Sequence, residues 1–260
     1  MANTQSIGNS LKRLPGQALR EERDRLFDSM ISEPLTIAFV GWVCFVLECL
    51  HVFGKIQPSL LLGAFIAIIT TVYAARKFFK GRCELRKYRR GEEGERIVAQ
   101  FIEQDLIPMG YSVFHDIQLE KDGRRFNIDH LLIGKNGIFA IETKNYSKPA
   151  KGSPEVRYDG KALIWNGIKH SQCDEIAQAI SAATSAKVLI GELTGLSVFV
   201  HPVLCAVGWY AKSTNLYGHP VLLVMEKTLK STIPKVTCNM ELSDSDQNKI
   251  IAALKRSVQL

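Results

Sequence analysis

One stretch decides the fold of this chain: NIDHLLI at residues 127–133, GKNG at 134–137 and IFAIETK at 138–144. Both flanks are rich in Ile, Leu and Phe over lengths that are typical of strands. The residues between them include two glycines and an asparagine, which tolerate the positive φ angles of a tight reversal. The stretch therefore predicts a β-hairpin whose loop is centred on Lys135 and Asn136.

Charged residues are the exceptions within this apolar hairpin. Successive side chains of a strand point to opposite faces, so Glu142 and Lys144 lie on the same face. The hairpin puts Asp129 on the partner strand, within reach of that face. The pattern therefore predicts that two carboxylates and a lysine converge.

Such a group suits the hydrolysis of phosphodiester bonds. Hard oxygen ligands bind Mg²⁺, and the ion lowers the pKa of a bound water and neutralises phosphate charge, while an ammonium orients the water or stabilises the developing anion. The solvent-facing side of an ordinary antiparallel hairpin shows a similar polar pattern. The spacing by itself leaves both interpretations open.

Four pieces of the sequence occur in an order that is typical of one family. They are Gly91-Glu92-Glu93-Gly94-Glu95, Ile128-Asp129-His130, Gly137-Ile138-Phe139 and Ile141-Glu142-Thr143-Lys144-Asn145-Tyr146. Together they resemble the nuclease-related domain, NERD, of the wider PD-(D/E)XK nuclease group, from about Gly91 to about Trp209. The resemblance implies a restriction-endonuclease-like α/β fold, a mixed β-sheet flanked by helices.

The resemblance also implies roles for four charged residues. Asp129 and Glu142 would bind Mg²⁺ or Mn²⁺, Glu95 would be a third carboxylate at the metal, and Lys144 would position the attacking water. Without the resemblance, Glu95 is better explained as a solvated acid in the first turn of a helix, where it complements the helix dipole.

A glutamine completes the set of residues that the resemblance implies. Gln178 corresponds to the active-site glutamine of the family, although Asp174-Glu175 stands where an Asn-Pro pair is usual. Gln172 is the less favoured substitute. An exposed glutamine without a catalytic role is the alternative interpretation.

Two apolar stretches precede this region. Residues 35–53 are apolar except for a few positions that include Glu48 and His51, and residues 59–75 contain no charge. Each approaches the ~20 residues that cross a bilayer, and the short link at 54–58 requires a helical hairpin. We expect two transmembrane helices. A buried helical pair in a soluble protein is the alternative, which Glu48 favours because a carboxylate is unfavourable in lipid.

The positive charge of the chain is concentrated next to the second apolar stretch. Residues 76–90 carry eight basic residues and one acidic residue, a surplus that equals the net charge of +7 of the whole chain. The basic pI therefore indicates an anchor near anionic headgroups rather than nucleic acid by itself. Five basic residues precede the first stretch and only Lys55 lies in the link, so both termini are expected in the cytoplasm.

Local charge around the hairpin is a separate signal. Residues 91–120 hold one basic and seven acidic side chains, whereas residues 121–169 hold ten basic and five acidic ones. A basic strip around the proposed site would attract phosphate backbones without reading bases. Exposed hairpins are also often basic for solubility alone.

Cysteine and histidine residues give no metal-site pattern. The six cysteines form no C-x-x-C pair, which indicates a reducing compartment and no cysteine-built metal site. His115, His130 and His201 have no companion at metal-ligand spacing, so we interpret them as structural or surface residues.

The remaining pattern predicts the other elements of the domain. We expect helices at residues 91–105, 171–193 and 243–258, a second hairpin over 156–165 that turns at Asp159-Gly160, and strands within 197–208 and 221–225.

The predicted organisation has four parts. They are a polar cytoplasmic segment at 1–34, two transmembrane helices at 35–75, a basic juxtamembrane linker at 76–90 and a NERD-like nuclease domain at 91–260.

Three functions are consistent with this organisation. The first is a metal-dependent nuclease of the cell (inner) membrane that acts on nucleic acid, expected to be DNA, with the lipid bilayer as its second partner. The second is a membrane-tethered module that binds nucleic acid or protein without cutting. The third is an oligomeric channel or sensor built by the hairpin helices and Glu48, and homo-oligomer formation stays open.

Overall fold

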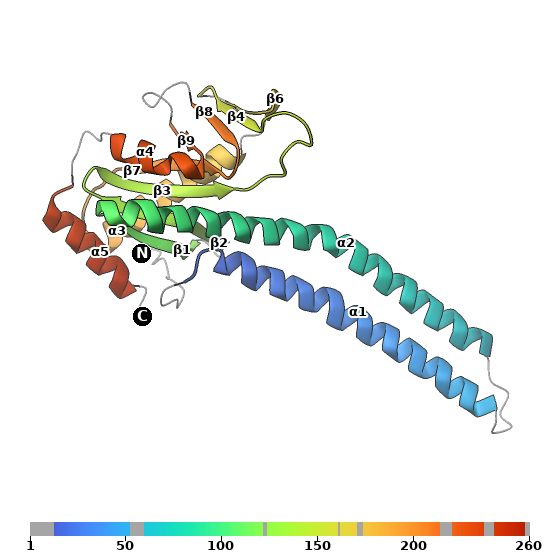
Figure 1. The fold of residues 1–260 in the computed structure, drawn as a ribbon. Coiled ribbons are helices and arrows are strands. Elements are labelled where there is room, and N and C mark those ends of the chain that lie inside the picture. Colours follow the sequence, from blue (N-terminus) through green and yellow to red (C-terminus); the bar gives the residue numbers. More distant parts are fainter. Residues whose placement is uncertain are drawn as a thin grey trace. The chain divides into compact units, whose positions relative to one another are not determined.

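The computed structural model describes residues 13–52, 60–121, 124–160, 162–170, 174–213, 220–236 and 242–257. Internal contacts divide it into two compact units. The helical unit is Leu19–Arg89, and the sheet unit combines Arg90–Leu260 with the described residues before Leu19, which are 13–18. Figure 1 labels the elements of both units.

Two long helices, α1 (Gln17–Val52) and α2 (Leu60–Phe101), make up the helical unit and each continues into the sheet unit at one end. Within the helical unit, Trp42 Nε1 donates a hydrogen bond to Thr71 Oγ1 at 3.3 Å, and Lys77 Nζ lies 2.6 Å from Glu33 Oε2. These contacts join α1 and α2 as an antiparallel pair.

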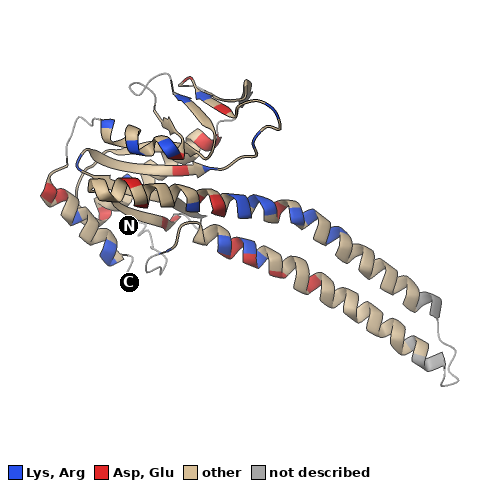
Figure 2. Cartoon of the chain, viewed as in Figure 1, with Lys and Arg blue, Asp and Glu red and all other residues tan. Residues whose placement is uncertain are grey.

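Both helices are longer than the predicted segments. The mixed-charge residues 20–25 belong to α1. The basic residues 76–90 are continuous turns of α2 rather than a separate linker, as Figure 2 shows. Gly81 is the only glycine before Gly91 in this run, and it does not break the helix. A Cβ at Gly81 would lie 2.0 Å from Met30 Sδ, so the glycine allows close packing instead.

The helical unit exposes many large apolar side chains. Phe39 is 69% exposed on α1, and Ile68 is 62% exposed on α2. Among the described residues, one helical segment, Gln17–Leu47, has the length and hydropathy of a membrane span. Within the described residues, the expected second span at 59–75 does not pass this test of length and hydropathy. The link at 54–58 and the side chain of Glu48 lie outside the described residues, so the two-span hairpin stays a prediction.

A mixed sheet is the centre of the sheet unit. Its order is β1-β2-β3-β7-β9, and the strands are β1 (Ser112–Lys121), β2 (Arg124–Gly134), β3 (Gly137–Lys144), β7 (Val200–Ala206) and β9 (Leu222–Val224). The first three strands are antiparallel neighbours, whereas β7 and β9 add in parallel. The predicted α/β class with a mixed sheet is confirmed.

The β2–β3 hairpin is confirmed with its predicted turn. Gly134 pairs with Gly137 and Leu131 with Ala140, so Lys135 and Asn136 form the reversal. Apolar side chains are buried on both faces of this hairpin, in contrast to a sheet with one solvated face.

Helices cover both faces of the sheet. They are α3 (Asp174–Thr194), α4 (Leu229–Thr232), α5 (Asp244–Ser257), a π-helical turn (Ile102–Leu106) and 3₁₀ turns (Ile107–Met109, Glu226–Thr228 and Ile233–Lys235). Residues such as Ile133 and Ala140 pack against α3 and α5 on one face. Their neighbours Leu132 and Ile141 pack on the other face against the end of α2, the π-helical turn and α4.

A smaller sheet lies beside the end of the large one. Its order is β6-β5-β4-β8, and the strands are β4 (Glu155–Tyr158), β5 (Leu163–Trp165), β6 (Ile168–His170) and β8 (Tyr210–Ser213). The β4–β5 pair is the predicted second hairpin. Trp165 packs edge to face against Tyr146 and Trp209, with ring centroids 5.0 and 4.8 Å apart, which fixes this sheet beside the chain that leaves β3.

One glycine lets α2 approach the end of β3 closely. A Cβ at Gly94 would lie 2.7 Å from the Cβ of Asn145, a separation that would force one of them to move. Asn145 Nδ2 also donates to the carbonyl of Arg90 at 2.9 Å. Gly94 therefore sets the distance between the following residue, Glu95, and the end of β3.

Two histidines form a buried pair between neighbouring strands. His115 on β1 is paired with His130 on β2, and their Nδ1 atoms lie 2.7 Å apart. Burial lowers the pKa of His115 to about 4 and lowers that of His130 as well. The His130 Nε2 atom is buried without a hydrogen-bond partner in the described part of the chain, which also favours the neutral ring.

We expect Gly94→Ala to destabilise the protein by about 2 kcal/mol, because the added methyl group overpacks the contact with Asn145. Thermal or denaturant unfolding of the full chain measures this change. Gly191→Ala is the matched control: Gly191 is also helical, and its Cβ would lie at an ordinary 3.6 Å from the Leu196 carbonyl. Equal stability of the Gly94→Ala and wild-type proteins would contradict the close approach.

We expect the histidine pair to make stability fall in acid. The folded-state pKa of His115, about 4, is below its ordinary value of 6.5, so its contribution is present above pH 6.5 and is lost as the pH falls to 4. Glu103 lies 3.6 Å from His115 and offsets part of the effect, which leaves about 2 kcal/mol. Urea unfolding of wild type and His115→Leu measures it: the two curves of stability against pH should run parallel from pH 7 to 8, and below 6.5 the wild-type curve should fall more steeply. An equal loss of stability with falling pH in the two proteins would contradict this prediction.

Candidate active site

The first acidic residue of the site lies where β2 and β3 separate. Their ladder ends at the pair His130–Ile141, one residue before Asp129 would face Glu142. In place of a strand carbonyl, the Asp129 carboxylate accepts the backbone N–H of Thr143, with Oδ2 at 2.8 Å. A buried carboxylate thus satisfies a backbone donor that the strand separation has freed.

A local distortion of β1 and β2 accompanies this arrangement. Asp116 has a φ of +48°, in the left-handed region, and the β1–β2 ladder skips the Asp116–Asp129 pair. Ile128 and Leu131 contact the same core although they are three residues apart, whereas regular alternation puts residues two apart on one face. The sheet is therefore irregular at the two aspartates, and backbone strain of this kind clusters at functional sites.

On β3, the predicted convergence of an acid and a base is present. Lys144 Nζ lies 2.7 Å from Glu142 Oε1, and both side chains are largely buried. Burial disfavours the ammonium, but Glu142, Asp129 and Glu175 together outweigh it and raise the pKa of Lys144. Lys144 therefore carries its positive charge among carboxylates.

Glu95 is brought to the same group from α2 and is only 4% exposed. Its Oε2 atom accepts the backbone N–H of Gly16 at 2.9 Å. Burial and the charges of Asp116 and Glu142 raise the pKa of Glu95 to about 8, although Gly16 and Lys144 act against this shift. Burial, Glu142 and Glu95 likewise raise the pKa of Asp129 well above its ordinary range.

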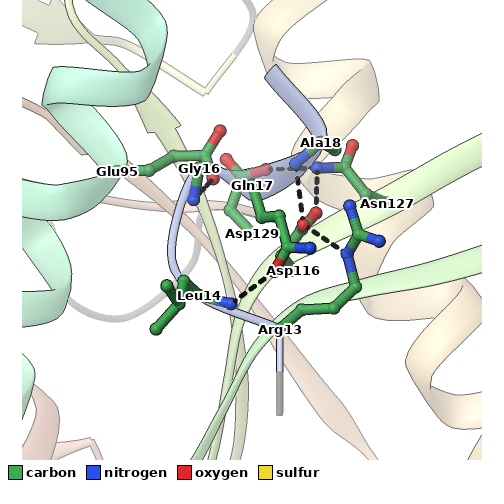
Figure 3. Close-up of polar contacts among 9 residues, drawn as sticks. All are labelled: Arg13, Leu14, Gly16, Gln17, Ala18, Glu95, Asp116, Asn127 and Asp129. Atoms are coloured by element: carbon green, nitrogen blue, oxygen red, sulfur yellow. Dashed lines mark hydrogen bonds and ion pairs between the residues drawn. The ribbon is translucent and has the colours of Figure 1, made fainter. Parts of the chain in front are cut away.

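A polar network at the site includes residues that the sequence did not identify. Asp116 is fully buried, and Asn127 Nδ2 donates to Asp116 Oδ1 at 3.2 Å and to Asp129 Oδ1 at 3.4 Å. Figure 3 shows Asn127 between the two aspartates. Asn127 lies two residues before Asp129, and this spacing was the signal that could have identified it. Asp116 gives only a weak signal, an acid inside an apolar run.

Helix α3 contributes a different residue from the predicted one. Gln178 is exposed on α3. One turn earlier, Glu175 is buried and accepts a hydrogen bond from the Tyr146 hydroxyl at 2.9 Å. The structure thus brings Glu95, Asp129, Glu142 and Lys144 together, with Glu175 close enough to act on the pKa of Lys144, and the role of Gln178 stays a prediction.

The donor set suits a hard divalent cation. Glu95, Asp129 and Glu142 supply carboxylate oxygens, which Mg²⁺ and Mn²⁺ prefer. Burial first, and then neighbouring carboxylate charge, raises the pKa of two of these acids, Glu95 and Asp129, and a bound cation would favour their charged forms. Across the described ranges, no three His, Cys, Asp or Glu side chains are gathered closely enough to hold one ion. In this arrangement the Glu95 carboxylate accepts a hydrogen bond from the Gly16 N–H.

The described residues of the expected basic strip do not all lie beside this group. Lys135 lies in the β2–β3 turn, at the opposite end of β3 from Lys144. Arg157 is exposed on the smaller sheet, and the side chain of Lys121 lies outside the described residues. Lys135 lies away from the group because a hairpin carries its turn to the opposite end, and the basic strip as a whole stays a prediction.

Comparison with known proteins shows similarity to a family model, to a protein of a bacterium and to a solved structure. The family model of the nuclease-related domain matches residues 90–207. A Bacillus anthracis protein described as uncharacterized is 35% identical over 68 residues, which are 26% of this chain and 32% of that protein. The chain thus spans about a third of the length of that relative.

A solved structure gives a more distant match. Can2 from Sulfobacillus thermosulfidooxidans, in complex with cyclic tetra-adenylate, matches with a TM-score of 0.31 and 12% identity, over 83% of this chain and 55% of that one. A likeness at this TM-score supports no conclusion about this chain. The family match, in contrast, coincides with the range that the four motifs predict and includes every acidic residue of the site. Residues 90–207, slightly less than half of the chain, therefore match the nuclease-related domain.

Proposed function

We propose that this protein is a membrane-anchored, metal-dependent nuclease that hydrolyses phosphodiester bonds of DNA, on a domain of the restriction-endonuclease-like type. The observation that carries the proposal is the convergence of buried Asp129, Glu142 and Glu95 with the Lys144 ammonium inside a nuclease-related domain. Acids that stay buried and repel one another suit a site that binds a cation.

Each residue has a distinct role in this proposal. Asp129, Glu142 and Glu95 would hold Mg²⁺ or Mn²⁺, and the ion would neutralise phosphate charge and lower the pKa of a water molecule. Lys144, 2.7 Å from Glu142, positions the attacking water and stabilises negative charge on the phosphate. The Thr143 N–H fixes the orientation of Asp129. Gln178, which is exposed on α3, stays a predicted supporting residue.

Membrane anchoring is the second part of the proposal. Exposed apolar side chains on both α1 and α2 support insertion of the pair as a two-span hairpin, and Gln17–Leu47 has the properties of a span. The basic turns at 76–90 would contact anionic headgroups of the cytoplasmic leaflet. The nuclease-related domain would then face the cytoplasm, where DNA is available.

We expect purified full-length protein in detergent to cut labelled plasmid or single-stranded DNA with Mg²⁺ or Mn²⁺ and not with a chelator. Asp129→Asn should abolish cutting because it removes a charged ligand. Lys144→Ala should lower the rate by about 100-fold, since a fixed charge at the reacting phosphate is lost. Gel assays of initial rates measure both effects.

The exposed ion pair Lys230–Asp105, at 2.9 Å, gives matched controls. Lys230→Ala and Asp105→Asn should cut like wild type, because they remove the same chemical groups at a position outside the carboxylate group. Salt-sensitive DNA binding without any cutting would contradict the nuclease and favour the non-cutting binding module.

A further inference from the structure

A short N-terminal segment lies on the carboxylate group. We call residues 13–18 the strap, and they belong to the sheet unit. Figure 3 shows the strap between Glu95 of α2 and Asp116 and Asn127 of the sheet. The Leu14 N–H bonds to Gln17 Oε1, and the Gln17 N–H bonds to the Leu14 carbonyl, both at 3.0 Å, so the strap forms its own turn.

The strap supplies hydrogen-bond donors to two acids of the site. Gly16 N–H reaches Glu95 Oε2 at 2.9 Å. Ala18 N–H and Arg13 Nε both reach Asp116 Oδ2, at 2.9 and 2.7 Å. The Arg13 side chain is only 8% exposed, so its ion pair with Asp116 is shielded from water. Hydrogen bonds to buried charged groups are the strong ones.

The conformation of the strap depends on a glycine. Gly16 has a φ of +72°, which side chains with a Cβ rarely adopt. A Cβ there would also lie 3.1 Å from the Cα of Glu92 on α2. Gly16 therefore allows the strap to approach α2 closely enough for its N–H to reach Glu95.

The Gly16 N–H fixes Glu95 Oε2 on the strap, and in this arrangement Glu95 is not gathered with Asp129 and Glu142 closely enough to hold one ion. We propose that the strap is an intramolecular inhibitor of cation binding, which occupies Glu95 and Asp116 and is displaced when a divalent cation binds Glu95, Asp129 and Glu142. This inference rests on the proposed function only in taking these three acids as the cation ligands.

The strap is covalently continuous with α1. Gln17 and Ala18 are its last residues and also the first turn of that helix, which contains the segment with the properties of a membrane span. Release of the strap therefore frees the first turn of α1 from Asp116. Chain continuity gives the cation site a direct connection to the membrane helix.

Hydrogen exchange of the full-length protein in detergent tests the inference without any cleavage assay. In the absence of metal, the Gly16 and Ala18 amides should be protected. Saturating Mn²⁺ should lower their protection by about tenfold, the loss expected when a hydrogen bond to a charged group breaks.

Calorimetric titration with Mn²⁺ is the second measurement. Gly16→Ala should bind Mn²⁺ about tenfold more tightly than wild type, since it strains the strap and leaves every carboxylate in place. Gly110→Ala is the control: Gly110 also has a positive φ, +93°, and its Cβ would meet nothing within 4 Å. Arg13→Gln should act like Gly16→Ala, whereas Arg25→Gln, at an exposed arginine of α1, should not.

The two hypotheses fail in different ways. Mn²⁺ binding with unchanged strap protection and equal affinity in Gly16→Ala would overturn the inhibitory strap, and metal-dependent cutting would still support the nuclease. Absence of Mn²⁺ binding in wild type and in all variants would overturn the inhibitor and the metal-dependent nuclease together.

Discussion

The separation of β2 and β3 beyond the pair His130–Ile141 is the constraint on which the site depends. Where the ladder ends, the Asp129 carboxylate accepts the Thr143 N–H, and Glu142 and Lys144 follow the last β2–β3 pair on β3. The core on both faces of the hairpin holds the strands in register up to this point. A rigid buried hairpin thus delivers charged groups to a fixed position.

Electrostatic crowding gives this position its chemical character. Glu95, Asp116, Asp129 and Glu142 approach one another in a buried environment, with Lys144 and Arg13 as the cations that contact them. Desolvation makes each carboxylate charge unfavourable, so any donor or cation that reaches the group is bound strongly. The same physics explains the attraction of a divalent ion and the attachment of the strap.

The fold of the domain was largely predictable from the sequence. The alternating and continuous apolar runs at 127–144, 156–165 and 197–208 correspond to β2, β3, β4, β5 and β7, and Ser243 Oγ accepts the Asp246 N–H at the start of α5. Strand β1 had no clear signal because its alternation breaks at Asp116. The extent of α1 and α2 was underestimated because charge runs were taken as boundaries, although charged residues are compatible with helix.

By itself, the sequence determined the hairpin, the charged residues that it carries and the match of residues 90–207 to the nuclease-related domain. Strand periodicity is a local property, so the common face of Glu142 and Lys144 could be read directly. Only the tertiary structure decided that Asp116, Asn127 and Glu175 join these residues and that the strap lies on Glu95. These contacts join positions up to 103 residues apart, and no local pattern records which distant residues meet.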